Sequence, residues 1–298
     1  MKIESKKLGL ATDSNSGISN KEAGELGIFI LPMPFQCEDK WYYEGVDLDR
    51  DEFFRESRNG KIFMTSQPAP EDVMKLWDKA LEKYEQILYI PMSSALSGAY
   101  STARCLADEE EYKDKVFVVD AGSVSTPMHR LILDAIELIN EGYSAKEILS
   151  IIEESREKMI IYIGLDTLEN LKRGGRISGS SALIGNVLNI KPVMKFSTGL
   201  LDIHKKCRGM KNAQQTMLQA IKDKIDNDFK DEFANGEVYI VAASSADEEA
   251  TANWVNKIKE FFPGVDVLCD PLPISLSCHI GEGGLGIGCA CKFKGDKK

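Results

Sequence analysis

The chain has no long apolar run. No segment of its 298 residues approaches the length of a membrane-spanning helix, about 18 apolar residues, and the amino terminus, MKIESKKLGL, lacks the apolar core of a signal peptide. Internal repeats, low-complexity tracts and long linkers are also missing from the sequence. These absences predict a soluble, cytoplasmic protein without an integral membrane segment.

Clustered positive charge and a regular cysteine pattern are missing as well. The formal net charge is −10, whereas nucleic-acid binding requires clustered cations, so we expect no nucleic-acid partner. The seven cysteines are odd in number and scattered, which suits a reducing compartment. Cys289 and Cys291 do not have a usual zinc spacing. On a strand both side chains point to one face, which predicts a small apolar pair and no metal site.

The sequence also lacks a phosphate-binding glycine loop. The glycine-rich segment 281–288 contains no GK[ST], so it predicts no independent ATP site. The acidic blocks at 47–56 and 108–114 are interpreted as solvated faces or loops. The chemistry must therefore come from other segments.

Short apolar runs alternate with helical patterns from residue 8 to about 157, which is typical of a parallel sheet with helices on both faces. From residue 159, a hairpin around Ser197-Thr198-Gly199, a helix at 181–188 and further strands and helices indicate a mixed sheet. We expect an α/β protein with two domains, 1–158 and 159–298, and a ligand site between them. The first domain has predicted strands at 8–11, 29–34, 87–91 and 116–119, and predicted helices at 20–27, 70–83, 98–110, 125–141 and 146–157.

One polar loop follows the predicted buried strand at 87–90. Its sequence, SSALSGAYSTA at 93–103, predicts a helix that begins near residues 97–99. The first N–H groups of that helix and the positive end of its dipole would face the hydroxyls of Ser93, Ser94 and Ser97. The loop thus predicts a cradle for a carboxylate or a phosphate. The alternative is that these serines only cap the helix.

Polar loops follow three more apolar runs. They are TDSNSG at 12–17, which contains Ser14, TSQP at 65–68, and DAGSVS at 120–125. Ligands of an open parallel sheet bind outside the carboxyl ends of its strands, so the four loops are predicted to converge on one crevice. Each loop taken alone is also compatible with ordinary turn chemistry.

Seven segments of the chain match one protein family in order and spacing. They are ATDSNSG (11–17), TSQP (65–68), SSALSGAYSTA (93–103), VVDAGSVS (118–125), LKRGGRIS (171–178), IKP (190–192) and HIGEGGLG (279–286). The chain thereby resembles the DegV family, fatty-acid-binding proteins that include the B-type subunit of bacterial fatty acid kinase. The resemblance implies a carrier of a long-chain free fatty acid, with no cofactor and no catalytic residues of its own.

The resemblance also implies which residues bind the fatty acid carboxylate. These are Thr65, Ser66, Ser97 and His279. The residue types suit that role because a carboxylate accepts charge-assisted hydrogen bonds, and an imidazole donates one either as histidinium or as a neutral N–H. Supporting residues in the same loops are Ser14, Ser93, Ser94, Gly98 and Gly281.

Two positions depart from the family pattern. Glu282 stands where the HxGPG sequence of the family has its proline, which predicts a more mobile, more acidic loop, weaker carboxylate binding or an upward shift of the His279 pKa. Ala99 replaces the threonine of the family's LSGT sequence, which removes one hydroxyl and leaves Ser97 in place.

The resemblance further implies a protein partner. An arginine of the LKRGGRIS segment, Arg173 first and Arg176 second, would dock the ATP-dependent kinase subunit that converts the bound fatty acid to acyl-phosphate. The alternative is that an arginine here pairs with a nearby carboxylate and holds the two domains together. His129 and His204 are expected to be surface or structural residues.

A different class of function stays open at this point. Ser97 could be the nucleophile and His279 the base of a serine hydrolase or an acyl-transferring enzyme, with Asp13 or Asp120 orienting the base. Sequence spacing does not separate a serine that binds a carboxylate from one that attacks an ester. Retention of stoichiometric lipid without ester turnover distinguishes the two.

Overall fold

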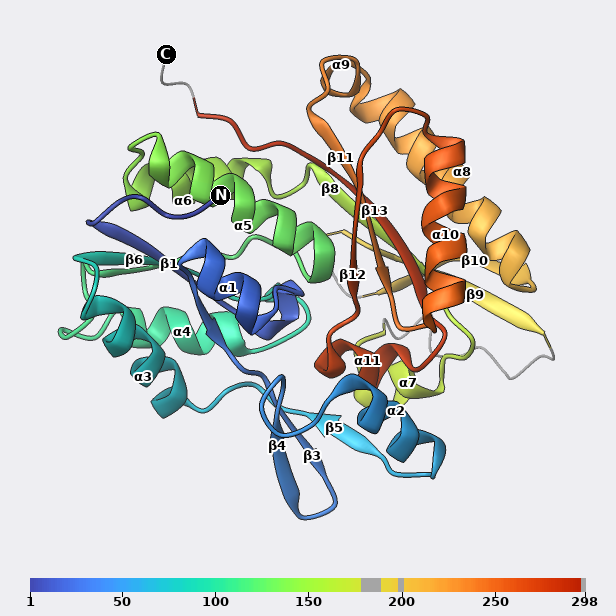
Figure 1. Ribbon diagram of the computed structural model, residues 1–298, viewed down its shortest axis with the longest axis horizontal. Coiled ribbons are helices and arrows are strands. Elements are labelled where there is room, and N and C mark those ends of the chain that lie inside the picture. Colours follow the sequence, from blue (N-terminus) through green and yellow to red (C-terminus); the bar gives the residue numbers. More distant parts are fainter. Residues whose placement is uncertain (178–188, 198–200, 296–298) are drawn as a thin grey trace. The chain divides into compact units, whose positions relative to one another are not determined.

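A computed structural model describes residues 1–177, 189–197 and 201–295. The helix expected at 181–188, Ser178 and the Thr198-Gly199 turn lie outside the described residues. The chain divides into two compact units, called here unit 1 (Met1–Arg156 together with Phe293–Lys298) and unit 2 (Glu157–Lys292). Unit 1 contains a parallel sheet and unit 2 a mixed one, so the predicted α/β fold class is confirmed (Figure 1).

The main sheet of unit 1 has the strand order β2-β1-β6-β7, and every neighbouring pair is parallel. Its strands are β1 (Leu8–Asp13), β2 (Phe29–Leu31), β6 (Gln86–Ile90) and β7 (Val116–Val118). The helices of this unit are α1 (Asn20–Leu26), α2 (Arg50–Arg58), α3 (Pro70–Leu81), α4 (Ala99–Ala107), α5 (Ser125–Asn140) and α6 (Ala145–Ser155). All of them except α2 lie within a few residues of a predicted helix.

Apolar residues on alternate strand positions explain why helices cover both faces of this sheet. On one face, Tyr89 of β6 packs with Trp77 of α3 and Ala103 of α4 in one buried cluster. Leu88 and Ile90 point the other way and are fully buried. α5 and α6 lie on that second side, and α6 contacts β6 and β7 (Figure 1).

A second, antiparallel sheet in unit 1 is only partly anticipated by the sequence. It has the order β4-β3-β5 and consists of β3 (Pro34–Cys37), β4 (Lys40–Tyr43) and β5 (Phe63–Thr65). α2 lies between β4 and β5 in the sequence, where solvated faces or loops are expected from the acidic composition. That interpretation of 47–56 is wrong in part, because Asp49 caps the helix at Glu52 and the helix buries Phe53 and Phe54.

The sheet of unit 2 has the order β10-β9-β8-β13-β11-β12. Its strands are β8 (Met159–Gly164), β9 (Ile190–Phe196), β10 (Asp202–Arg208), β11 (Val238–Ser244), β12 (Val267–Pro271) and β13 (Leu285–Cys291). The helices are α7 (Glu169–Gly174), α8 (Met210–Asp228), α9 (Lys230–Ala234), α10 (Glu248–Phe261) and α11 (Ile274–Ile280). The only parallel pair among these strands is β11 with β12, as the described residues show, so the sheet is mixed.

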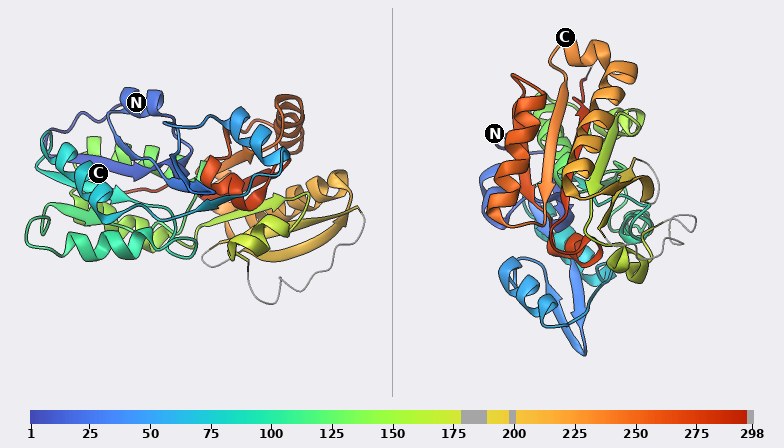
Figure 2. Two further views of the ribbon diagram at one scale, coloured as in Figure 1. Left: turned by 90° about the horizontal axis from the view of Figure 1, so that it is seen from below. Right: turned by 90° about the vertical axis from the view of Figure 1, so that its right-hand side faces the viewer.

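Helices α8 and α10 pack on one face of this sheet and bury its main apolar cluster (Figure 2). Trp254 of α10 is fully buried there, and its Nε1–H donates to the backbone oxygen of Gly286 (2.9 Å). Cys289 and Cys291 belong to the same cluster, as predicted for an apolar pair on a strand. Burial raises the pKa of the Cys289 thiol to about 12, which keeps it protonated at neutral pH.

After β13 the chain returns to unit 1. The N–H of Phe293 donates to Asp134 Oδ2 of α5 (3.0 Å), whereas the N–H of Cys291 still donates to the backbone oxygen of Lys158 in unit 2 (3.0 Å). Residues 157–292 are thus inserted between two segments of unit 1. Within the described parts of the chain, no helix combines the length and the apolar composition needed to cross a lipid bilayer.

Candidate functional site

The polar loop after β1 is tied to the loop after β6 by a buried carboxylate. Asp13 Oδ2 accepts from the N–H of Met92 (2.8 Å), and Asp13 Oδ1 accepts from the N–H of Asn15 (2.9 Å). Burial raises the pKa of Asp13 to about 6, against the lowering effect of these two hydrogen bonds. The next residue, Ser14, forms its hydrogen bond elsewhere: its hydroxyl donates to Glu44 Oε2 (2.8 Å). Asp13 and Ser14 therefore have structural partners within unit 1.

The loop after β7 meets the same region. The N–H of Ser93 donates to the backbone oxygen of Ser123 (2.9 Å), and the N–H of Ser94 donates to Asp120 Oδ1 (3.2 Å). Asp120 Oδ1 also accepts from the N–H of Gly122 (3.0 Å), and Asp120 Oδ2 pairs with Arg156 (2.8 Å). Asp120 thus fixes the two loops relative to each other.

Two serines of the 93–103 segment accept hydrogen bonds from backbone N–H groups near the start of α4, which is part of the capping role named above as the alternative. α4 begins at Ala99, as expected, and Ser97 Oγ accepts from the N–H of Ala99 (3.2 Å). Ser93 Oγ likewise accepts from the N–H of Ala95 (3.3 Å). A hydroxyl that accepts in this way keeps its own proton, so Ser97 retains the ability to donate to an anion.

The TSQP loop lies against the start of α4. Gln67 Nε2 donates to Thr102 Oγ1 (3.0 Å), and a Cβ placed on Gly98 would overlap Gln67 Oε1. Gly98 therefore permits the close approach of the loop that carries Thr65 and Ser66. Together with the contacts above, this places all four polar loops in one region of unit 1.

His279 lies on α11 near its carboxyl end, and not in the glycine-rich loop where the sequence suggests it. α11 packs against α7, and a Cβ on Gly174 of α7 would overlap His279 Nδ1. The glycine-rich loop begins at Gly281, whose φ of +80° favours glycine. It is held by Ser245, whose hydroxyl donates to the oxygen of Gly281 (2.7 Å) and accepts from the N–H of Gly284 (2.9 Å).

The pKa of His279 is lowered to about 4 by burial first and by the charge of Arg176 second. The expected upward shift from Glu282 is therefore wrong, because desolvation and a nearby cation both disfavour the imidazolium. At neutral pH His279 is a neutral imidazole with one N–H donor. The sequence left open whether His279 donates as histidinium or as a neutral imidazole, and the low pKa favours the neutral imidazole.

The lowered pKa of His279 implies that the stability of the protein depends on pH. We expect the free energy of unfolding of the ligand-free protein to fall, relative to that of a His279→Gln variant, as the pH drops from 6.5 to about 4. In this window the unfolded chain binds a proton that the folded protein does not bind, so the contribution of neutral His279 is complete above 6.5 and disappears at about 1.4 kcal/mol per pH unit. Urea unfolding at several pH values measures the difference.

The comparison with the variant is needed because Asp13 acts in the opposite direction. Its pKa is raised from 3.8 to about 6, so its contribution is complete below 3.8 and is lost as the pH rises towards 6. Both proteins contain Asp13, and its effect cancels in their difference. A difference that does not change with pH would contradict the prediction for His279.

Arg173 lies in the last turn of α7 and Arg176 lies two residues after this helix ends, and the two arginines have different surroundings. Arg173 is exposed and forms no ion pair with any residue that the structure describes. Arg176 is half-buried and donates from Nη1 to the backbone oxygen of Gly174 (2.5 Å). Arg176 is therefore close enough to His279 for its charge to lower the pKa of the imidazole, whereas Arg173 is exposed.

The predicted site residues are distributed over both units. Thr65, Ser66 and Ser97 belong to unit 1, and His279 belongs to unit 2. Sequence analysis missed Ser245, although it follows the apolar strand β11 in the same way that the other polar loops follow theirs. His129 is buried and structural, with Nε2 3.1 Å from Glu22 Oε1, and His204 stacks edge-on against Tyr162.

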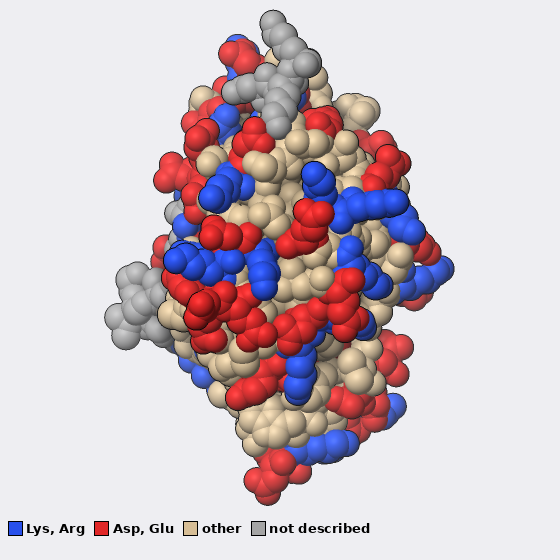
Figure 3. All heavy atoms as spheres, turned by 90° about the vertical axis from the view of Figure 1, so that its left-hand side faces the viewer, with Lys and Arg blue, Asp and Glu red and all other residues tan. Residues whose placement is uncertain are grey.

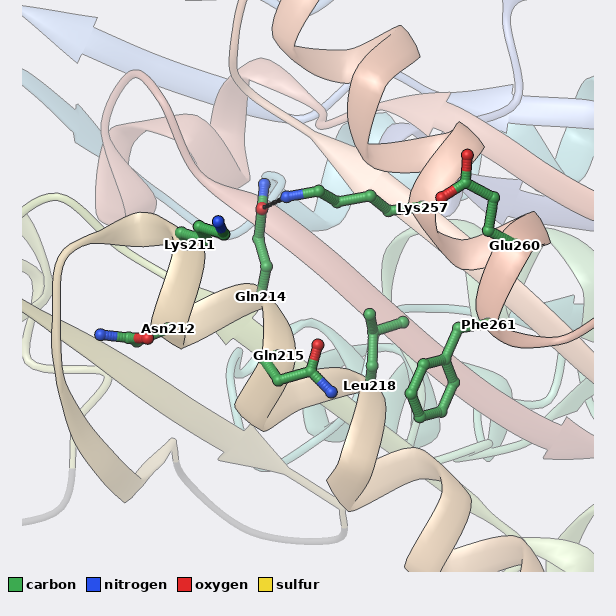
Figure 4. Close-up of a pocket in the computed structure, with 8 residues that line it drawn as sticks. All are labelled: Lys211, Asn212, Gln214, Gln215, Leu218, Lys257, Glu260 and Phe261. Atoms are coloured by element: carbon green, nitrogen blue, oxygen red, sulfur yellow. Dashed lines mark hydrogen bonds between the residues drawn. The ribbon is translucent and has the colours of Figure 1, made fainter.

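A hollow of about 390 Å³ lies elsewhere in unit 2, between α8 and α10 (Figure 4). Lys257 Nζ donates to Gln214 Oε1 across it (2.6 Å). None of its residues belongs to the seven matched segments: it is lined by Lys211, Asn212, Gln214, Gln215, Leu218, Lys257, Glu260 and Phe261. On the molecular face drawn in Figure 3, Lys and Arg side chains are interspersed with Asp and Glu side chains.

Known proteins similar to this chain share both its sequence pattern and its fold. A family model described as "Uncharacterised protein, DegV family" matches residues 7–292. A DegV domain-containing protein of Clostridium perfringens is 30% identical over 299 residues, which cover 98% of this chain and 99% of that protein. A fatty acid-binding DegV family protein from Thermus thermophilus has a TM-score of 0.84 at 30% identity, over 96% of this chain and 99% of that chain. DegV of Bacillus subtilis, a fatty acid binding protein, has a TM-score of 0.82 at 26% identity, over 97% and 100% of the two chains.

Proposed function

The chain belongs to the DegV family, and on this premise we propose that it binds a long-chain fatty acid. The proposed ligands of the carboxylate are the hydroxyls of Thr65, Ser66 and Ser97 and the imidazole of His279. The proposal requires donors from both units, and it assigns supporting roles to Ser14, Ser93, Ser94, Gly98 and Gly281. The protein is a carrier and has no catalytic residues of its own.

The observation that carries the proposal is the packing of the TSQP loop against the start of α4. The Gln67–Thr102 hydrogen bond and the close approach to Gly98 hold the Thr65 and Ser66 segment beside Ser97. Ser97 Oγ accepts from the N–H of Ala99 and keeps its proton for an anion. Hydroxyl donors grouped in this way suit a carboxylate, which accepts several hydrogen bonds at once.

Neutral His279 fits the same role. An uncharged imidazole donates one hydrogen bond to a carboxylate, and the binding carboxylate would raise the low pKa of His279 because an anion favours the imidazolium. Binding is therefore expected to take up protons at mildly acidic pH. This coupling belongs to a carboxylate ligand and is not expected for a neutral lipid.

The serine hydrolase alternative has less support. Both aspartates that would orient the base are engaged inside unit 1: Asp13 accepts from two backbone N–H groups, and Asp120 accepts from two more and pairs with Arg156. A catalytic triad needs a carboxylate that orients the histidine. The carrier function does not need one.

The experiment that tests the proposal is mass spectrometry of an organic extract of the purified protein. We expect near-stoichiometric fatty acid from the wild type and little from a Ser97→Ala, His279→Ala double variant, because each of the two substitutions removes a proposed hydrogen-bond donor to the carboxylate. A Ser150→Ala variant is the matched control, since Ser150 is exposed on α6, belongs to none of the four polar loops and should leave the lipid content unchanged. No fatty acid in the wild type, together with turnover of an ester substrate, would replace the carrier function by the hydrolase.

We further propose that the carrier presents the carboxylate to a separate ATP-dependent fatty acid kinase. In that step a carboxylate oxygen attacks the γ-phosphorus of ATP, the bond to the β,γ-bridging oxygen breaks, and acyl-phosphate and ADP form. The carrier supplies the positioned carboxylate, and the kinase supplies the nucleotide site.

Arg173 provides a test of this step. We expect Arg173→Ala to lower the rate of ADP formation by the kinase at least tenfold without changing the lipid content, because its guanidinium is exposed and engages no carboxylate of the described residues. Lys172→Ala, which removes the neighbouring exposed cation, is the control. Equal rates for the Arg173→Ala variant and the wild type would remove Arg173 from the docking surface.

A further inference from the structure

Exposed large apolar side chains are concentrated on the small sheet β4-β3-β5 and the turns beside it. Among the residues that the structure describes, the exposed ones are Met1 at the amino terminus and five that lie between residues 41 and 64: Trp41, Tyr43, Val46, Ile62 and Met64. Monomeric proteins seldom expose a contiguous apolar patch without a function for it, so this concentration indicates an interaction surface.

Strand register places three of these side chains on one face of the sheet. Gln36 of β3 pairs with Trp41 on one side and with Met64 on the other, and directly opposite residues of neighbouring strands point to the same face. Tyr43 follows two positions after Trp41 on the same strand, so it shares that face. We call this face, with Gln36, Trp41, Tyr43 and Met64, the outer face.

The opposite, inner face of the sheet is already packed. Phe35 stacks on Tyr42 with ring centroids 5.6 Å apart, and Phe63 contacts Phe53 of α2 at 4.9 Å. Thr65 pairs with Phe35 and therefore also lies on the inner face. A partner on the outer face would leave both this packing and Thr65 untouched.

None of the four residues of the outer face is charged. Its polar groups are the Gln36 amide and the Tyr43 hydroxyl, and Gln36 Nε2 already donates to the backbone oxygen of Glu38 (2.8 Å). A face of this composition is suited to an apolar contact and not to an ionic one.

The charges of neighbouring residues lie away from the outer face. Lys40 Nζ lies over the Tyr42 ring (4.6 Å), and Lys61 pairs with Glu56 of α2 (2.6 Å), so both lysines are on the side of the inner face. The acidic residues 38–39 form the turn between β3 and β4. The outer face is therefore uncharged, with one acidic turn at its edge.

The charge of the whole chain indicates which partner such a face fits. At a formal net charge of −10, two copies repel each other over most of their surfaces. A two-fold axis places the same patch on both sides of an interface, so a patch that binds its own copy has to be free of net charge, and the outer face meets this condition. Acidic side chains would select a basic protein and basic ones an anionic lipid surface, and the outer face presents neither.

The exposed area predicts the strength of such a contact. Trp41 is 49% exposed, Met64 46% and Tyr43 37%, and Ile62, directly before β5, is 48% exposed. Together these four side chains expose roughly 400 Å², so two copies would bury about 800 Å² through them alone, against about 1,200–2,000 Å² in a stable interface. The area therefore fits a weak, reversible dimer with a Kd of about 1–100 µM.

We infer that the outer face is an interface between two copies of this chain, in which Trp41 and Met64 of each copy pack against the same face of the other. This inference does not depend on the proposed function. The dimer leaves Thr65 on the inner face of each copy. Because both copies are acidic, added salt should lower the Kd by screening their repulsion.

Sedimentation velocity of the purified protein from about 1 to about 300 µM tests the inference, since this range brackets the expected Kd. We expect the wild type to pass from monomer to dimer, and Trp41→Thr, Met64→Thr to raise the Kd at least tenfold because the apolar anchors are lost. Threonine keeps the strand propensity of both positions. Val267→Thr, at a half-buried position of the edge strand β12, is the control and should leave the Kd unchanged.

Acrylamide quenching of tryptophan fluorescence adds a measurement that needs no substitution. Trp77 and Trp254 are fully buried, so Trp41 is the accessible one of the three tryptophans. We expect quenching of the wild type to fall as its concentration rises through the Kd, because the second copy covers Trp41. Urea unfolding and the lipid content of the double variant should match the wild type, since its substitutions are on exposed positions of the outer face.

Three results would overturn the inference. The first is a wild type that stays monomeric over the whole concentration range. The second is a dimer whose Kd is the same in the folded double variant, or whose formation leaves the quenching of Trp41 unchanged, because association would then use another surface. The third is a monomeric wild type that binds phosphatidylcholine vesicles through Trp41 and Met64, which would assign the outer face to a lipid surface.

Discussion

Replacing Gly174 by alanine is expected to displace His279 and to destabilise the helix pair α7 and α11. The added Cβ would overlap the imidazole Nδ1, and α11 packs against α7 at this point. Overpacking of this type typically costs about 1–3 kcal/mol. We expect a lower melting temperature and, because the imidazole moves, loss of most of the bound fatty acid from the purified protein.

Two other glycines serve as controls for the Gly174→Ala variant. Gly24 lies on α1 with no atom within 4 Å of its added Cβ, so Gly24→Ala should stabilise the protein by about 0.5–1 kcal/mol. Gly175 also has open space around it but has a φ of +67°, so its replacement reports backbone strain alone. Lipid retained at wild-type level by Gly174→Ala would show that the position of His279 does not govern binding.

Replacing Trp77 by alanine should have the largest effect on stability, about 3–5 kcal/mol. Trp77 is fully buried in unit 1, where it makes edge contacts with Tyr89 (5.6 Å) and Tyr112 (5.2 Å). Its Nε1–H has no hydrogen-bond partner among the described residues. Trp77→Phe should therefore cost much less, since it keeps an aromatic ring and removes a buried unpaired donor.

Trp41 is the matched residue of the same type. It is 49% exposed, so Trp41→Ala should change the free energy of unfolding by about 0.5 kcal/mol or less. Chemical denaturation of the three variants under one set of conditions measures the comparison. Equal losses for Trp77→Ala and Trp41→Ala would mean that burial does not determine their contributions.

The larger elements of this fold could be predicted from the sequence because their patterns are local. The apolar runs that form β1, β6 and β7 and the helical spacing of α3 and α5 each recur within one element. α2 was missed because its acidic composition resembles a solvated loop, whereas the buried Phe53 packs against Phe63 of the β4-β3-β5 sheet. Such burial depends on tertiary contacts that a local pattern does not contain.

The convergence of three of the four polar loops could be predicted for a related reason. The loops after β1, β6 and β7 follow parallel strands, which end at one edge of the sheet and bring their loops together whatever their individual sequences are. The TSQP loop follows β5 of the antiparallel sheet, and it joins the others through its own contacts with the start of α4. The state of His279 could not be predicted in this way. Its low pKa arises from burial and from Arg176, which lies two residues after the end of α7, far from His279 in the sequence, and no sequence spacing links them.

The return of the chain to unit 1 after β13 makes unit 2 a nested insertion. Its first and last strands, β8 and β13, pair with each other, and the N–H of Cys291 donates to the backbone oxygen of Lys158 just before β8, so the two points where the insertion enters and leaves are adjacent. A protease that cuts one of the two connections would leave both units covalently linked through the other. The same topology makes residues 157–292 a natural module to excise, with a short linker closing unit 1 in its place.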